Sequence, residues 1–439
     1  MGRVCVLMVS LATKRIMRTK TIGILGCILF VTASACADTG AGRADTLFRA
    51  YQDRVYQIRV IEITSGKKAS TGSAFGVSTN GLLATNYHVV RQAIHDPRLY
   101  RLECVGPDGK TSALRIIDID VVHDLAIVLR DLSVTECLVL SSASFEKGTT
   151  LFALGNPLDL GMAIVEGTYN GLLEKSFYEK ILFSGSLNPG MSGGPTINRE
   201  GEVVGVSVTT MGQQISFLVP VKHLKRLLDR ISKVGLDAPV DFHKRIEQQL
   251  MDNQDEYMSR LMAAEWPLDS LGAARVPRIL SEVLDWWGDT EIDKEALYEH
   301  TYATCFSKDD IFLSSSFSTG KVRYRCDWYV SKGLNAPRFY NLLQKEYEGT
   351  FKLNSAGKDD VSNFESRTDF VRIAGKDWRV TFCARNYKKY PHLYDVVVNM
   401  ASMVKPDRAL LIGLELSGVS EDTGAAFVRK FMEAIQWQD

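Results

Sequence analysis

The chain has 439 residues, 45% of them hydrophobic and 24% charged, and a chain of this size and composition is typical of a folded protein with two or three domains. Five of the 52 basic residues lie before Cys36, where no acidic residue occurs, so the rest of the chain has 47 basic residues against 52 acidic ones. This balance excludes the basic excess on which nucleic-acid binding depends, and we expect no nucleic-acid partner.

Residues 1–37 predict a signal peptide or an N-terminal anchor. Arg18 and Lys20 precede an apolar run at 22–31, and an Ala-Ser-Ala pattern of the kind that signal peptidases cleave ends at Ala35. The 17 uncharged residues that begin at residue 21 are near the shortest length that spans a bilayer as an uncleaved anchor. Cys36 follows a sequence that resembles a bacterial lipobox, so its lipidation is a third alternative. We expect an exported protein of the bacterial periplasm or envelope, attached to the membrane in the last two cases.

Residues 50–220 predict an all-β region. Short runs rich in Val, Ile, Leu and Thr alternate with Gly, Asn, Asp and Pro at the spacing of strands and turns. The expected strands are Val55–Ile63, Gly72–Val77, Gly81–Thr85, Ser112–Ile119, Leu125–Leu129, Thr150–Leu154, Met162–Thr168 and Glu202–Val208. Regularly spaced short strands favour a β-barrel or a sandwich with functional loops at its turns.

The pattern becomes helical after Pro220. Apolar residues recur at helical spacing up to Gly235, and a second helical stretch follows. Beyond Trp266 an α+β region is indicated. Its expected strands are Asp310–Ser315, Val322–Val330, Asp369–Ile373, Trp378–Cys383, Tyr394–Met400 and Ala409–Leu414, and its expected helices are Pro337–Tyr347 and Gly424–Ile435. All six tryptophans lie from Trp266 onward, and we interpret them as a compact aromatic core rather than a peptide-binding surface.

The strongest local signal is Asn188-Pro189-Gly190-Met191-Ser192-Gly193-Gly194-Pro195. A serine nucleophile must be exposed on a tight turn while backbone N–H groups converge on the oxyanion, and side chains beside it would block that approach. We therefore predict Ser192 as a nucleophile, with the N–H groups of Gly190 and Ser192 as its oxyanion hole. A simple Gly/Ser turn between strands would look similar.

Two further residues complete a catalytic set. His88 closes an expected strand and could accept the Ser192 proton as a general base. Asp124 opens another apolar strand and could fix the His88 tautomer. The order His, Asp, Ser along the chain is that of the chymotrypsin-type fold. His123, next to the acid, is expected to point away from it because strand neighbours face opposite sides.

Seven segments resemble the HtrA/Deg serine proteases over about residues 50–232. They are Gly72–Phe75, Thr85–Val90, Asp124–Ala126, Leu154–Pro157, Asn188–Pro195, Gly201–Gly205 and Phe217–Pro220. The resemblance implies a double β-barrel that hydrolyses peptide bonds of polypeptide substrates through an acyl-enzyme, without a metal or an organic cofactor. It also implies a role in protein quality control, the degradation of misfolded proteins.

The chain departs from the family pattern near the substrate pocket. Ser184-Gly185-Ser186 replaces the usual Thr-Asp-Ala, and Met191 stands where Asn is common. Ser186, six residues before the nucleophile, is expected to line the primary pocket and to favour small or medium apolar side chains over a broad substrate range. No PDZ-like carboxylate-binding loop follows residue 235, so PDZ regulation is not carried over, and the oligomeric state stays open.

We thus expect a trypsin-like protease domain at 45–235, a helical connector at 236–265 and an α+β domain of unknown role at 266–439. Few contacts should cross the connector, so that a chain ending near Leu236 would fold. The five cysteines after Cys36 are expected to be buried thiols with at most one bridge, and no metal site is indicated. The expected function is a serine endopeptidase acting on exported or misfolded proteins. The alternative is a catalytically silent protease-like scaffold whose C-terminal domain binds a partner.

Overall fold

The computed structural model describes residues 43–438 apart from 133, 135, 211–214, 294, 296 and 350–355. The predicted export signal and Cys36 lie outside the described residues. Ala41–Asp439 hold together as one compact unit. None of the helices in the described part of the chain is long and apolar enough to cross a membrane.

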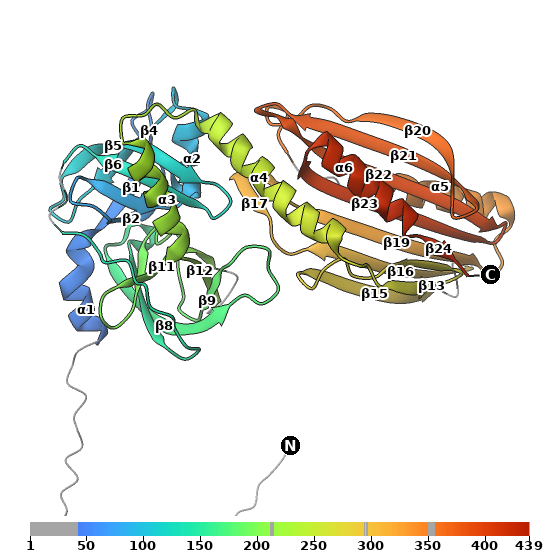
Figure 1. The fold of residues 1–439 in the computed structure, drawn as a ribbon, viewed down its shortest axis with the longest axis horizontal. Helices are drawn as coiled ribbons and strands as arrows, with labels where there is room; N and C mark the ends of the chain where they lie inside the picture. The colour runs from blue at the N-terminus through green and yellow to red at the C-terminus, as the bar shows by residue number, and fades with distance from the viewer. Residues whose placement is uncertain are drawn as a thin grey trace, which may run out of the picture. The chain divides into compact units, whose positions relative to one another are not determined.

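The first β-barrel is closed by six antiparallel strands in the order β1-β2-β3-β6-β5-β4. It is drawn in blue and cyan in Figure 1. They are β1 (Val55–Glu62), β2 (Lys68–Gly76), β3 (Leu82–Thr85), β4 (Tyr100–Val105), β5 (Thr111–Asp120) and β6 (Leu125–Arg130). Helix α1 (Ala44–Tyr51) precedes the barrel, and α2 (Tyr87–His95) lies between β3 and β4. Ile58 and Val60, two residues apart on β1, are fully buried, as the two-residue period of a strand requires.

The second barrel is closed in the order β10-β11-β12-β9-β8-β7. Its strands are β7 (Thr150–Gly155), β8 (Ala163–Leu172), β9 (Ile181–Phe183), β10 (Pro195–Ile197), β11 (Val203–Thr210) and β12 (Ser216–Pro220). The sequence predicts most strands of both barrels, including one at Thr196 that corresponds to β10, but not β4, β9 or β12. Strand length does not separate the two groups, because β3, which is predicted, has only four residues.

Helix α3 (Val221–Val234) closes the two barrels together. Its buried Leu224 and Leu227 share one apolar cluster with Ile127 of the first barrel and Val206 of the second. The predicted closing helix and the double β-barrel are therefore confirmed.

A seven-stranded antiparallel sheet follows, in the order β15-β16-β19-β23-β22-β21-β20. Its strands are β15 (Leu284–Asp293), β16 (Tyr298–Ser307), β19 (Val322–Ser331), β20 (Glu365–Ile373), β21 (Lys376–Tyr387), β22 (Tyr390–Lys405) and β23 (Arg408–Val419). Three short strands, β13 (Leu268–Leu271), β14 (Ala274–Pro277) and β24 (Gln436–Trp437), form a small second sheet. The predicted α+β character of this region is confirmed, although β15 and β16 are not predicted from the sequence.

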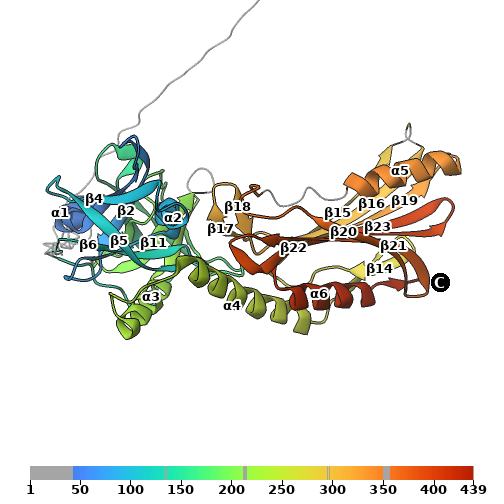
Figure 2. The ribbon, with the colours of Figure 1, turned by 90° about the horizontal axis from the view of Figure 1, so that it is seen from above.

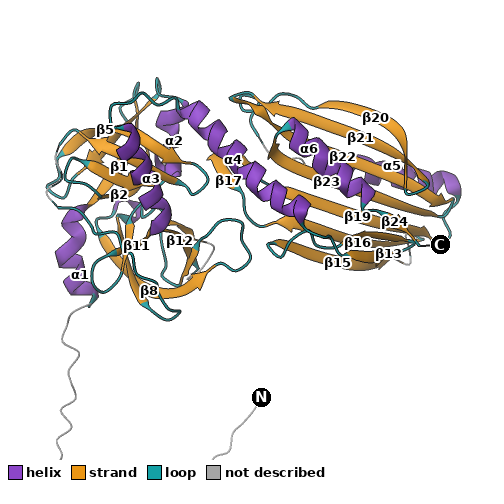
Figure 3. Cartoon of the chain, in the orientation of Figure 1, coloured by secondary structure: helices purple, strands orange, loops and turns teal. Residues whose placement is uncertain are grey.

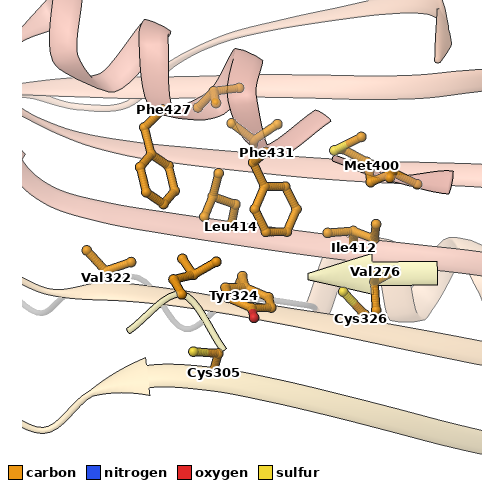
Figure 4. Close-up of a cluster of buried hydrophobic side chains, with 14 of the residues drawn as sticks. Val276, Cys305, Val322, Tyr324, Cys326, Met400, Ile412, Leu414, Phe427 and Phe431 are labelled. Carbon is orange, nitrogen blue, oxygen red and sulfur yellow. The ribbon is translucent and has the colours of Figure 1, made fainter. Parts of the chain in front are cut away.

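Helices cover both faces of the large sheet. Figures 2 and 3 show α6 (Glu421–Glu433) on one face and α5 (Ala336–Gly349) on the other. Along β23 the side chains alternate between these helices, with Leu410 in the α6 cluster and Leu411 in the α5 cluster. Phe427 and Phe431 project from α6 onto Leu414 and its neighbours (Figure 4). Burial of these large aromatic and aliphatic groups stabilises the sheet.

Helix α4 (Phe242–Ala263) joins two apolar clusters. Near its start, Ile246 belongs to a cluster that contains first-barrel residues, whereas Leu261 near its end belongs to the core of the large sheet. Gln249 between them accepts a hydrogen bond from the Val121 N–H at 2.8 Å and donates one to the Ile119 carbonyl at 2.7 Å. The expectation that few contacts cross the connector is therefore wrong, because the helix buries apolar residues at both ends.

The tryptophans and cysteines agree with their predictions only in part. Trp378 is fully buried in the core of the large sheet, but Trp287 is 63% exposed. The five cysteines of the described residues are all unpaired thiols. Cys104, Cys305 and Cys326 are buried, as expected of small apolar residues.

Candidate active site

The pairing of β3 with β6 brings His88 and Asp124 together. Thr85, the last residue of β3, lies opposite Ala126 on β6. His88 follows β3 by three positions and Asp124 directly precedes β6, so both lie at the same edge of the barrel. His88 does not close a strand, as the sequence suggested, but lies in the first turn of α2. Strand β3 ends at Thr85, and α2 begins two residues later at Tyr87.

Asp124 holds both the ring and the backbone of His88. Its carboxylate accepts a hydrogen bond from His88 Nδ1 at 2.6 Å and another from the His88 backbone N–H at 2.8 Å. Asn86, the residue that precedes α2, makes no capping hydrogen bond with its side chain, so Asp124 satisfies an N–H group that a helix start leaves without a partner. Because a carboxylate only accepts, the ring proton lies on Nδ1 and Nε2 remains an acceptor.

Ser192 lies on a turn before β10, and the two positions that follow it require glycine. Gly193 has a φ of +85°, and a Cβ there would lie 2.2 Å from the Ser73 carbonyl oxygen. A Cβ on Gly194 would lie 2.1 Å from the Leu154 carbonyl oxygen. The glycines that suggested a nucleophile turn are thus required by close backbone contacts.

Ser73 on β2 positions this turn. Its hydroxyl donates to the Gly190 carbonyl at 2.7 Å and accepts from the Asn156 N–H at 3.0 Å. Its backbone N–H donates to the Ser192 carbonyl at 2.8 Å. In the sequence, Ser73 stands out only as part of a family motif, because its role depends on contacts more than 80 positions away along the chain.

Two N–H groups remain available beside the nucleophile. The N–H groups of Met191, Gly193 and Gly194 donate to backbone carbonyls at 2.8 to 3.0 Å. In the described part of the chain, no hydrogen bond uses the N–H groups of Gly190 or Ser192. These are the two groups predicted for an oxyanion hole, and the turn leaves both free to bind a ligand oxygen.

The Ser192 hydroxyl donates to the Val208 carbonyl at 2.6 Å. Among the hydrogen bonds of the described residues, none joins Ser192 to His88. Both side chains nevertheless line the same cavity. A rotation about the Cα–Cβ bond of Ser192 would therefore be needed to turn the hydroxyl toward His88 Nε2, and catalytic hydrogen bonds often form only when substrate is bound.

The cavity has a volume of about 400 Å³. Its lining is mainly apolar and consists of His88, Asp124, Leu187, Asn188, Pro189, Ser192, Val208 and Phe312. Ser186 is exposed and does not line this cavity, and its assignment to the primary substrate pocket stays a prediction. The next residue, Leu187, turns inward instead, because neighbours in an extended segment face opposite sides.

Two other residues near the motif point away from the cavity. Met191, which departs from the family pattern, is fully buried in a cluster of the second barrel. His123 bonds to Asp120 at 2.8 Å and stacks on His223. It faces away from the cavity as expected, although it lies in the turn before β6 rather than on a strand. Phe312 also lines the cavity, but the sequence does not predict this, because Phe312 follows Ser192 by 120 positions and belongs to no motif.

Comparison with known proteins finds a trypsin-like peptidase domain over this region. The model of the trypsin-like peptidase domain matches residues 72–206. The mitochondrial serine protease HTRA2 of Drosophila ananassae is 30% identical over 208 residues, which are 45% of this chain and 47% of that protein. HTRA2 of Drosophila erecta is 31% identical over 210 residues, which are 45% of this chain and 48% of that protein. The chain thus spans about half the length of these relatives.

Two solved structures also resemble part of the chain. A serine endoprotease from Yersinia pestis is 20% identical, with a TM-score of 0.39 over 44% of this chain and 68% of that one. Deg5 is 27% identical, with a TM-score of 0.38 over 43% of this chain and 92% of that one. On the family model and the relatives in sequence, the chain carries a trypsin-like peptidase domain similar to those of the HtrA/Deg serine proteases.

Proposed function

We propose that this protein is a serine endopeptidase in which Ser192 is the nucleophile, His88 the general base and Asp124 the residue that orients it. One observation carries the proposal. The Asp124 carboxylate binds both the Nδ1 and the backbone N–H of His88, which leaves Nε2 as a proton acceptor in the cavity that Ser192 also lines. A hydroxyl, a correctly oriented imidazole and a carboxylate that holds it are the groups that acyl transfer needs.

In the proposed first step, the Ser192 hydroxyl turns from the Val208 carbonyl to His88 Nε2. Its oxygen attacks the substrate carbonyl while Nε2 takes the proton, and the N–H groups of Gly190 and Ser192 hold the negative oxygen. His88 then gives this proton to the leaving amine. The C–N bond breaks, and the acyl group remains on Ser192 as an ester.

In the second step, water attacks the ester. His88 takes a proton from the water and returns it to Ser192 Oγ as the ester bond breaks. The products are a carboxylic acid and the free hydroxyl. This sequence consumes one water for each peptide bond and uses no metal or organic cofactor.

The proposed substrates are unfolded or misfolded polypeptides with apolar side chains near the cleaved bond. The apolar lining by Leu187, Pro189 and Val208 supports this class, because an apolar pocket distinguishes substrates only weakly and accepts a broad range. The proposed location is the bacterial envelope, which rests on the basic, apolar and small-residue pattern that ends at Cys36. Mass spectrometry of the protein from fractionated cells tests this location: a chain cleaved near Cys36 is expected in the envelope fraction, and an uncleaved chain in the cytoplasmic fraction would contradict it.

A fluorophosphonate probe tests the proposed chemistry. The probe reacts with serine hydroxyls that a neighbouring base activates, so the wild-type protein should be labelled at Ser192 and Ser192→Ala should not. Ser232→Ala is a matched control, because Ser232 is exposed on α3 and bonds only within its own helix. A folded wild-type protein that the probe does not label would favour the alternative of a catalytically silent scaffold.

A further inference from the structure

A hairpin of the C-terminal half packs against the helix that carries His88. Strands β17 (Ile311–Ser314) and β18 (Phe317–Thr319) form this hairpin. Ile311 and Leu313 are at most 2% exposed and share an apolar cluster with Tyr87 and Val90 of α2. The Tyr87 hydroxyl also lies 3.2 Å from the Leu313 carbonyl oxygen, to which it can donate a hydrogen bond. The hairpin is therefore fixed to the residues next to His88.

Phe312 lies between the two buried residues and faces the other way. Successive side chains of a strand point to opposite faces, and Phe312 accordingly lines the cavity that contains His88 and Ser192. Its ring meets the His88 ring edge-on, with 6.5 Å between centroids and 89° between planes. The Arg91 guanidinium lies 4.9 Å from the Phe312 centroid, a cation–π geometry that holds the ring in place.

The exposure of Phe312 distinguishes it from a residue that only packs. It is 37% exposed, whereas Ile311 and Leu313 are almost completely covered. A large aromatic group that is held on one side and open on the other offers apolar area to a ligand at low entropic cost. The open side faces the cavity in which the proposed reaction takes place.

We propose that Phe312 forms an apolar wall of the substrate cleft beside His88 and selects large apolar side chains at a substrate residue that flanks the attacked one. This inference rests on the proposed function. The attacked residue is expected to occupy the part lined by Leu187 and Pro189, close to the oxyanion groups, whereas Phe312 contacts His88 and Arg91. The C-terminal half thus contributes a specificity-determining residue to a cleft whose reactive groups all come from the barrels.

The test uses the full-length protein and fluorogenic peptides that differ at one position, with Phe, Leu, Ala or Gly at each residue flanking the cleaved one. The wild-type protein should prefer Phe or Leu to Gly by about 10-fold or more in kcat/KM at one flanking position. Phe312→Ala should reduce that ratio about 10-fold, and Phe312→Leu should restore part of it. Phe370→Ala is the matched control, because Phe370 is 75% exposed and lies on β20, outside the cavity lining.

Several results would overturn the inference. An equal loss of kcat/KM for every peptide would show that Phe312 acts through the fold or through His88, and an unchanged preference would show that it does not meet the substrate. If Phe312→Ala does not fold, the same preference ratio is measured for Phe312→Leu, and a fall of about 3-fold is expected. A wild-type protein that neither reacts with the fluorophosphonate nor cleaves any peptide would refute the proposed function itself, and the inference with it.

Discussion

Asp124 has a left-handed backbone conformation, with a φ of 55°, that is uncommon for residues other than glycine. Hydrogen bonds from the start of α2 hold it there: its carbonyl accepts from the Asn86 side chain at 2.8 Å and from the Tyr87 N–H at 3.2 Å. Because its carboxylate binds the same helix, one residue both caps α2 and orients His88. Activity and stability should therefore respond differently to different replacements of Asp124.

We expect Asp124→Asn to fold and to lose about 10⁴-fold in kcat, because an amide presents a donor to His88 Nδ1 and favours the wrong tautomer. Asparagine tolerates the left-handed conformation and keeps an oxygen for the His88 N–H. Asp124→Ala lacks that oxygen and should unfold about 1 kcal/mol more easily than Asp124→Asn. Urea unfolding and peptide hydrolysis measure the two effects. Equal stability of the two variants would contradict the capping role.

Gly193 permits a comparison of two glycines that both have positive φ. Gly193→Ala should destabilise the protein strongly and abolish labelling of Ser192, since its Cβ would lie 2.2 Å from the Ser73 carbonyl oxygen. Gly148 has a φ of +103° with nothing within 4 Å of an added Cβ, so Gly148→Ala should cost only about 1 kcal/mol of backbone strain. Thermal unfolding of both variants tests this. A Gly193→Ala protein as stable as Gly148→Ala would contradict the close contact.

At the scale of elements, α2 links His88 to the C-terminal half of the chain. Its first turn holds His88, and its buried face packs against the β17–β18 hairpin. At its end, His95 Nε2 bonds to the Tyr87 hydroxyl at 2.8 Å, and the His95 ring lies 5.6 Å from that of His243 on α4. A change in the charge of His95 should therefore alter the stability of the contacts among α2, the hairpin and α4.

Burial lowers the pKa of His95 from 6.5 to about 4, with smaller effects of Lys389 and His243. Between pH 6.5 and pH 4, His95 binds a proton in the unfolded chain but not in the folded protein. The contribution of His95 to the free energy of unfolding is therefore complete above pH 6.5. It is lost as the pH falls toward 4, by roughly 3 kcal/mol in total. His95→Gln can keep a bond to Tyr87 without titrating, so urea unfolding should show a smaller loss from pH 7 to 4.5. An unchanged loss would contradict this account.

The local signals in the sequence predict the barrel elements well because each depends on near neighbours. The β3 and β6 strands are apolar runs ended by turn residues, and the glycines around Ser192 mark a tight turn. The helical position of His88 was not predicted, because the apolar residues of β3 continue into α2 without a proline or glycine between them. Ser186 does not line the cavity beside Ser192, because counting positions from Ser192 does not show which way each side chain turns.

At the scale of the whole molecule, apolar residues of the two halves pack together, and no pattern in the sequence predicts these contacts. One cluster contains Val60 of the first barrel, Leu250 of α4 and Phe317 of the hairpin. Contacts between residues so distant in sequence leave no periodic signal, which is why the sequence suggested separable halves. The boundaries at 45–235, 236–265 and 266–439 stay a prediction, but the cluster argues against independent folding of the first part.

Removal of everything after Leu236 should therefore yield an insoluble or aggregating protein. The truncation uncovers Tyr87, Ile94 and Val121, which are at most 5% exposed in the whole chain and belong to the shared cluster, and a contiguous apolar patch on the surface promotes association. Size-exclusion chromatography of the truncated protein beside the full-length Ser192→Ala variant tests this. A soluble, monomeric truncated protein that still hydrolyses peptides would contradict it and restore the two-module view.

The most direct test of the central claim is the rate of hydrolysis of unfolded casein by the full-length protein and by three variants, Ser192→Ala, His88→Ala and the double variant. If the two residues act as a unit, each single change should lower kcat by roughly 10³- to 10⁶-fold, and the double change should cost no more than either alone. Circular dichroism confirms that each variant is folded. Substantial hydrolysis by Ser192→Ala, or losses that multiply in the double variant, would contradict the account.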